Sequence, residues 1–121
     1  MTEKVLLVED DADLREALTE TLRDEGYDVA AAAHGLEALE RLRKDAHPDV
    51  ILLDLMMPVM NGWEFRARQR EDAALAAIPV ILLSAAPDLE VQRVELEARD
   101  AVRKPVPRER LLASIRKALS S

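Results

Sequence analysis

Apolar runs rich in β-branched residues alternate along the chain with longer segments in which apolar and polar residues are mixed. The runs are short and mostly uncharged, which is typical of strands that are buried on both faces of a sheet. They predict five β-strands, over residues 4–8, 28–32, 50–53, 78–84 and 100–104.

The segments between and after these strands place apolar residues at helical spacing. The apolar stripe is clear in three of them and weaker in the other two, one of which is assigned a helix because parallel strands need a crossover. Gly26 is expected to cap the end of the first helix, and Pro107 is expected to open the last. The five predicted helices lie near residues 14–22, 36–42, 63–72, 88–98 and 111–119.

Five strands that alternate with five helices indicate a parallel sheet covered on both faces. The 121 residues fit one domain, so residues 1–121 are predicted to form a single α/β unit. Because the chain starts with Met1 and closes on a helical pattern, we also expect it to be a natural whole.

Composition narrows the possible function classes. The formal net charge is −7 and there is no basic block, so a nucleic-acid partner is not expected. The lack of cysteine excludes disulfides and thiolate metal sites. No segment resembles a signal peptide or a membrane span, so we expect a soluble, cytoplasmic protein with no membrane partner.

Polar residues stand where four of the five strands end. Glu9 and Asp10 follow the first strand, and Asp54 follows the third. Ser84 ends the fourth strand and Lys104 ends the fifth. The carboxyl ends of parallel strands share one edge of the sheet, where ligands bind. Each residue alone is common in a turn or a cap, but the positions together indicate a site.

The chemistry of this set favours phosphoryl transfer. Glu9, Asp10 and Asp54 offer only oxygen ligands, which suit a hard cation such as Mg²⁺. Lys104 offers a positive charge and Ser84 a hydroxyl donor for phosphoryl oxygens. Asp54 is then the candidate carboxylate nucleophile, which would form an acyl phosphate.

Four stretches, "KVLLVEDD", "DVILLDLMMPVMNGWEF", "IPVILLSA" and "RKP", resemble the receiver domain of bacterial two-component response regulators. The resemblance extends over essentially the whole chain and is greatest to single-domain, chemotaxis-regulator-like members. It implies a flavodoxin-like (βα)5 fold, with a doubly wound parallel five-stranded sheet in the order 2-1-3-4-5.

The same resemblance implies a role for each site residue. The phosphoacceptor would be charged by a sensor histidine kinase or a histidine phosphotransfer protein, with Mg²⁺ bound by carboxylates, by one backbone carbonyl and through water. The hydroxyl would turn toward the phosphoryl group, and the lysine, aimed by a cis bond to Pro105, would pair with it. The implied catalytic residues are Asp54, Lys104 and Ser84, and the implied metal ligands are Asp10, Asp54, Met56 through its carbonyl, and Glu9 through water.

Several positions carry further expectations. Gly62 is expected to need a positive φ, and the side chains of Met56, Met57 and Met60 are interpreted as packing around a proline turn. Ala101 stands where the family usually has an aromatic residue, so little aromatic rearrangement is expected on activation. A further departure lies at residues 97–98, which read Glu-Ala where the family commonly has Gly-Ala.

The leading interpretation is a stand-alone receiver, not an enzyme in the ordinary sense, that signals through protein contacts at the face formed by residues 88–119. The resemblance also implies that the residues two beyond Asp54 and two beyond Ser84 tune hydrolysis of the acyl phosphate. These are Met56 and Ala86, whose side chains cannot hydrogen-bond an attacking water, so slow autodephosphorylation is expected. The alternatives are a phosphorelay intermediate and a receiver cut from a larger regulator or hybrid kinase. An aspartyl phosphatase is disfavoured because Met56 stands where a second carboxylate is needed, and a scaffold is disfavoured because the acidic set is complete. The oligomeric state is expected to be a monomer or a weak homodimer.

Overall fold

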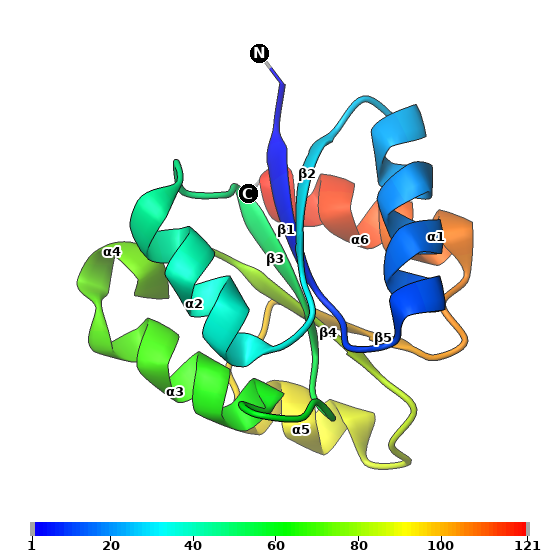
Figure 1. Cartoon of the computed structure of the whole chain (residues 1–121). Helices are drawn as coiled ribbons and strands as arrows, with labels where there is room; N and C mark the ends of the chain where they lie inside the picture. Colours follow the sequence, from blue (N-terminus) through cyan, green and yellow to red (C-terminus); the bar gives the residue numbers. More distant parts are fainter. Residues whose placement is uncertain (1, 121) are drawn as a thin grey trace.

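A computed structural model describes residues 2–120, within which five strands and six helices follow one another (Figure 1). The strands are β1 (Lys4–Val8), β2 (Asp28–Ala32), β3 (Val50–Asp54), β4 (Val80–Ser84) and β5 (Asp100–Arg103). The helices are α1 (Ala12–Asp24), α2 (Gly35–Lys44), α3 (Gly62–Glu71), α4 (Ala73–Ala76), α5 (Leu89–Glu95) and α6 (Arg108–Leu119). The predicted strands are confirmed with small shifts at their ends. The short helix α4 was not predicted.

All five strands are parallel and lie in the order β2-β1-β3-β4-β5, which confirms the flavodoxin-like fold. The register aligns the strand ends: Asp54 of β3 pairs with Leu83 of β4. Ser84 pairs in turn with Arg103 of β5. The carboxyl ends of the inner strands therefore meet at one edge of the sheet.

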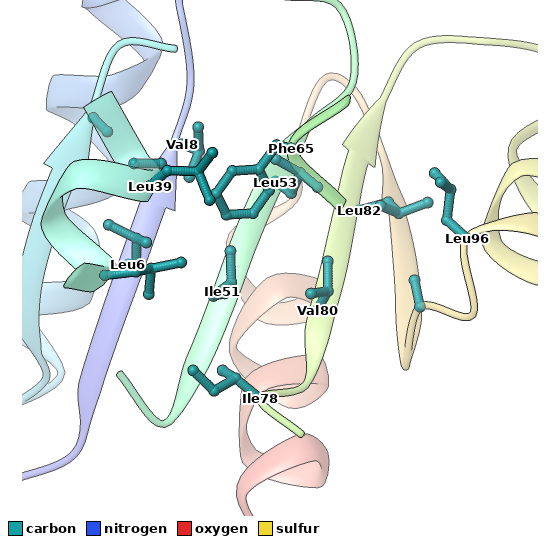
Figure 2. Packing of buried hydrophobic residues seen from close by; sticks show 14 of the residues in the cluster. Leu6, Val8, Leu39, Ile51, Leu53, Phe65, Ile78, Val80, Leu82 and Leu96 are labelled. Atoms are coloured by element: carbon teal, nitrogen blue, oxygen red, sulfur yellow. The ribbon is translucent and has the colours of Figure 1, made fainter. Parts of the chain in front are cut away.

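Alternate residues of each inner strand enter two separate cores. Ile51 and Leu53 of β3 point to the side covered by α2, α3 and α5, where Phe65 is fully buried (Figure 2). Val50 and Leu52 point to the opposite side, which α1 and α6 cover. Because both faces are covered, every residue of β3 is buried, and this explains its continuous apolar run.

Local sequence signals set the element ends near the site. Asp11 caps α1, its side chain accepting hydrogen bonds from the backbone N–H groups of Asp13 and Leu14. Gly26 follows the helix with φ 94°, as expected for a left-handed cap. The predicted cis bond between Lys104 and Pro105 is confirmed.

The expectation that Gly62 needs a positive φ is wrong. The positive φ in this loop falls on Val59, at 66°, and the glycine is needed for space instead. A Cβ at Gly62 would lie 2.8 Å from the Cα of Leu55 and 2.9 Å from the carbonyl oxygen of Asp54. A side chain there would displace the end of β3.

The described residues include no helix with the length and apolar character that a membrane crossing would require.

Candidate functional site

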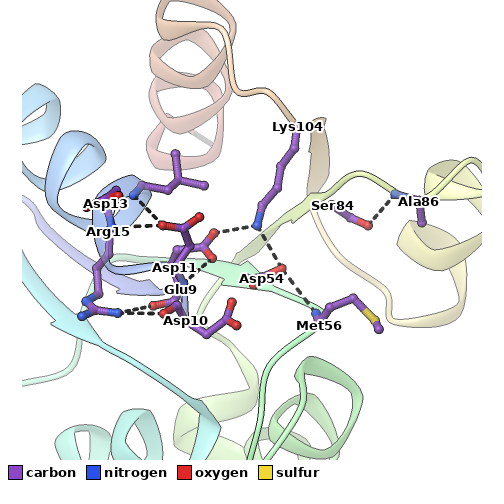
Figure 3. A network of polar contacts seen from close by, with 11 residues as sticks. Glu9, Asp10, Asp11, Asp13, Arg15, Asp54, Met56, Ser84, Ala86 and Lys104 are labelled. Atoms are coloured by element: carbon purple, nitrogen blue, oxygen red, sulfur yellow. Dashed lines mark hydrogen bonds and ion pairs between the residues drawn. The ribbon is translucent and has the colours of Figure 1, made fainter.

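Three carboxylates converge at the carboxyl end of the sheet, as predicted. Glu9 and Asp10 follow β1, and Asp54 ends β3 (Figure 3). Each contributes an oxygen that lies within 4.8 Å of the others. Glu9 and Asp54 are buried, whereas Asp10 is exposed. The cluster is therefore closed on its protein side and open to solvent at Asp10.

Lys104 reaches into this cluster from the end of β5. Its Nζ lies 2.8 Å from Oε1 of Glu9 and 3.3 Å from Oδ1 of Asp54. The backbone N–H of Lys104 also donates to the carbonyl oxygen of Ser84 at 3.0 Å, which continues the pairing between β4 and β5 by one residue. One ammonium group thus bridges two buried carboxylates.

The close approach of these charges shifts their pKa values. Burial, then the neighbouring carboxyl groups of Asp10 and Glu9, raise the pKa of Asp54 to about 7. Burial also acts to raise the pKa of Asp10, but hydrogen bonds with the carboxyl groups of Asp54 and Glu9 and with the backbone, together with the charge of Lys104, outweigh it and lower that pKa. Burial acts to lower the pKa of Lys104, and the carboxylates of Glu9 and Asp54 outweigh it, so the pKa of Lys104 is raised.

These residues fit a hard divalent cation. The cluster consists only of oxygen donors, and three carboxylates exceed the single positive charge of Lys104. Burial and the neighbouring carboxyl groups raise the pKa of Asp54, and a bound cation would offset both effects by favouring the ionised carboxylate. The cluster could therefore hold a metal ion such as Mg²⁺.

The backbone of Met56 lies beside the cluster. Its N–H donates to Oδ1 of Asp54 at 3.3 Å. Its side chain is 69% exposed, so the interpretation of Met56 as a packing residue is wrong, whereas Met57 is buried and Met60 packs against the core. The exposed thioether stands at the rim of the site.

Ser84 is buried at the end of β4, but its hydroxyl is directed away from the carboxylates. Its Oγ accepts a hydrogen bond from the N–H of Ala86 at 3.1 Å (Figure 3). The carbonyl oxygen of Ala86 accepts in turn from the guanidinium of Arg103 at 2.6 Å. The loop after β4 is thus held in a conformation that keeps Ser84 out of the cluster.

Sequence reasoning missed Arg15, which lies in the first turn of α1. Its Nη1 donates to the carbonyl oxygen of Glu9 at 2.8 Å and to that of Asp10 at 3.3 Å (Figure 3). The only signal in the sequence is a cation in the first turn of a helix, where acidic residues are preferred.

A second missed group is Arg66 of α3, which is buried and contacts the end of α5. Its guanidinium donates to the carbonyl oxygens of Leu96 at 2.9 Å and Glu97 at 3.1 Å, and to Oε1 of Gln69 at 2.8 Å. Glu97 has φ 51°, a conformation that favours glycine, and its carboxylate lies 3.3 Å from Arg70. These contacts hold Glu97 in that conformation.

Residues 5–116 match the family model described as "Response regulator receiver domain". Among curated proteins, the chain is 39% identical over 121 residues to the DNA-binding response regulator MtrA of Mycobacterium tuberculosis. That alignment covers 98% of this chain and 51% of the relative. The chain therefore spans about half the length of the curated relatives it matches first.

Solved structures show the same fold. A putative response regulator from Chloroflexus aurantiacus J-10-fl superposes with a TM-score of 0.92, at 29% identity and with both chains fully covered. The chemotaxis response regulator CheY4 of Vibrio cholerae gives a TM-score of 0.90 at 35% identity, covering 98% of this chain and 100% of that one. The receiver domain of a signal transduction histidine kinase from Syntrophus aciditrophicus gives 0.89 at 31% identity, covering 98% and 91%.

Proposed function

The chain belongs to the response regulator receiver domain family, and from this premise we propose that it is a phosphorylation-controlled signalling module in which Asp54 is the phosphoacceptor. The observation that carries the assignment is the position of Asp54, buried at the end of β3 between Lys104 and two further carboxylates. No other described carboxylate cluster combines these features.

The proposed reaction is the transfer of a phosphoryl group from a phosphohistidine. A carboxylate oxygen of Asp54 attacks phosphorus, the new P–O bond forms, and the P–N bond to the donor imidazole breaks. The imidazole leaves with the electron pair and is protonated from solvent. The product is an acyl phosphate on Asp54.

The residues that would hold Mg²⁺ are Asp10 and Asp54 directly, Glu9 through water, and Met56 through its backbone carbonyl. When bound, Mg²⁺ would neutralise charge on the phosphoryl oxygens. Asp10, which is exposed, leaves the open side of the cluster free for an incoming donor.

Lys104 and Ser84 would act on the phosphorylated state. Lys104 exchanges one of its carboxylate contacts for a phosphoryl oxygen, which its position 3.3 Å from Asp54 allows without a large movement. Ser84 leaves the N–H of Ala86 and donates its hydroxyl to another phosphoryl oxygen. The rotation of Ser84 links phosphorylation to the loop that leads into α5.

The proposed partners are a histidine kinase or histidine phosphotransfer protein as donor and a protein target at the 88–119 face. Val91 and Val94 of α5 are 54% and 58% exposed, so this face presents apolar surface to solvent. Helix α5, which carries both valines, follows the loop that begins after Ser84.

A second candidate is that the chain is the receiver part of a longer regulator. The observation that favours it is that the chain covers only 51% of the DNA-binding response regulator MtrA. The mass of the gene product in its native host distinguishes a stand-alone receiver from the receiver part of a longer regulator.

The direct test is incubation with Mg²⁺ and acetyl phosphate, followed by mass spectrometry. One added phosphoryl group that hydroxylamine removes, and that is lost in Asp54→Ala, is the expected result. Asp24→Asn, an exposed acidic residue at the far end of α1, is the matched control and should be phosphorylated like the wild type. An unmodified wild type under all conditions would contradict the proposal, and transfer of the phosphoryl group onward to a histidine phosphotransfer protein would identify a relay.

A further inference from the structure

Arg15 occupies an unusual place in α1. It lies in the first turn of the helix, where the partial positive charge of the helix N-terminus disfavours a cation. Its side chain is half-buried and runs back toward the helix start, the direction that helical side chains favour. This placement needs a compensating interaction.

That interaction is with the backbone of the loop between β1 and α1. The guanidinium donates to the carbonyl oxygens of Glu9 and Asp10, at 2.8 and 3.3 Å. Glu9 and Asp10 are two consecutive residues of the acidic cluster. Arg15 contacts their backbone on the side opposite their carboxylates (Figure 3).

Glu9 has further restraints, one of which is on its backbone: its N–H donates to the carbonyl oxygen of Ala32 at 3.0 Å. Oε2 of Glu9 accepts from the N–H of Asp11 at 3.1 Å, and Oε1 lies 2.8 Å from Lys104. Asp10 is exposed, and among the described residues its backbone has no such bond to β2. The bond from Arg15 to its carbonyl oxygen therefore bears directly on where the Asp10 carboxylate points.

We propose that Arg15 is a positioning residue for the metal site: it fixes the backbone at Glu9 and Asp10 so that the Asp10 carboxylate is aimed at the cation. This inference rests on the proposed function, because the cation is Mg²⁺ in a receiver site. Arg15 does not touch the ion; it acts through the loop.

Arg15 has two opposing effects on Mg²⁺ affinity. Its positive charge near the carboxylates weakens cation binding, whereas its hold on the loop strengthens it. Salt screens the charge of a partly exposed guanidinium, while the geometric effect persists, so the positioning effect is expected to dominate. Loss of an outer-shell partner of metal ligands lowers affinity about 10-fold or more.

The test is Mg²⁺ titration by calorimetry on three variants of the full chain. Arg15→Met removes both charge and hydrogen bonds, and Arg15→Lys keeps the charge but not the guanidinium. Arg23→Met is the matched control, since Arg23 of the same helix also donates to a backbone carbonyl, that of Val29 at 3.2 Å, away from the site.

Both Arg15 variants should bind Mg²⁺ about 10-fold more weakly, and Arg23→Met should bind like the wild type. In metal-free protein, amide hydrogen exchange at Asp10 and Asp11 should be faster in Arg15→Met, at an unchanged free energy of global unfolding. If that variant does not fold, Arg15→Lys decides by the same two measurements.

Equal or tighter Mg²⁺ binding by Arg15→Met would overturn the inference while leaving the proposed function intact. A wild type that binds no Mg²⁺ and accepts no phosphoryl group would instead refute the proposed function itself.

Discussion

The ammonium nitrogen of Lys104 lies 3.3 Å from Oδ1 of Asp54. Two residues 50 positions apart in the sequence are thus joined at the centre of the site, because β3 and β5 both flank β4 and end at the same edge. The contact supplies a positive charge where a phosphoryl group would add negative charge.

Replacing Lys104 with Met should slow phosphorylation by acetyl phosphate about 100-fold, since one preorganised cation is lost from the site. It should also raise the pKa of Asp54 further, because Lys104 acts to lower that pKa. Time-resolved mass spectrometry and NMR titration measure the two effects. Lys117→Met, on exposed α6 surface, is the control, and phosphorylation of Lys104→Met at the wild-type rate would contradict the assignment.

Mg²⁺ affinity should depend on pH through Asp54, whose pKa is raised to about 7 in the metal-free site. Below that pH the cation must displace a proton, so the apparent affinity should fall about 10-fold per pH unit and level off above pH 7.

Folding stability should change in the opposite sense. The native metal-free state binds this proton more tightly than the unfolded state, so the stabilising contribution is present at low pH and is lost as pH rises toward 7. Calorimetric titrations of wild type and Asp54→Asn measure the Mg²⁺ affinity, and urea melts of the same two proteins measure the folding stability. The pH dependence of stability in this window should shrink in the variant, and an unchanged profile would exclude Asp54 as its source.

Arg66→Met should destabilise the protein by about 2–3 kcal/mol, because buried carbonyl and amide oxygens would lose their donor. The contacts at risk are those to Leu96, Glu97 and Gln69. Arg68→Met, on the exposed side of the same helix, should change the free energy of unfolding by less than about 0.5 kcal/mol. Equal urea midpoints for Arg66→Met and Arg68→Met would show that these hydrogen bonds of Arg66 do not stabilise the fold.

Val59→Gly should stabilise the fold by about 0.5–1 kcal/mol. Val59 is a β-branched residue at φ 66°, and its side chain is 72% exposed, so little packing is lost when the strain is removed. Val91→Gly, at an exposed position within α5, should do the reverse and destabilise by a similar amount. Thermal or urea unfolding of both variants checks the opposite signs, and a destabilised Val59→Gly would show that the loop is not strained.

The acyl phosphate should be lost slowly, with a half-life of minutes or longer. The thioether of Met56 is exposed at the rim and cannot orient an attacking water, and Ala86 has no polar side chain. Met56→Asn should accelerate hydrolysis about tenfold by supplying an amide there. A half-life of only seconds in the purified wild type would refute this explanation of the lifetime.

The sequence predicted the cluster well because its members stand at strand ends. Asp54 and Lys104 are placed by topology alone, so a correct strand assignment brings them together. The four-residue helix α4 is too short to show a period and was missed. Gly62 was assigned the wrong reason because crowding by Leu55 depends on a contact that no local pattern records.

The missed arginines have a common physical cause. Arg66 reaches carbonyl oxygens 30 residues away, and Arg15 reaches back over the start of its own helix. The acceptor of a long flexible side chain depends on where the folded backbone lies. Every residue has a backbone carbonyl, so the sequence does not show which carbonyl will accept. Such contacts follow from the fold and cannot be read before it.

Helix α5 has two unequal ends. Its last turn is tied to α3 through Arg66 at Leu96, whereas at its start the side chain of Asp88 makes no capping hydrogen bond among the residues described. A movement that begins at Ser84 would reach the helix at the end with fewer restraints. The helix would then tilt about its fixed end, and Val91, one turn in from the free end, would travel farther than Leu96.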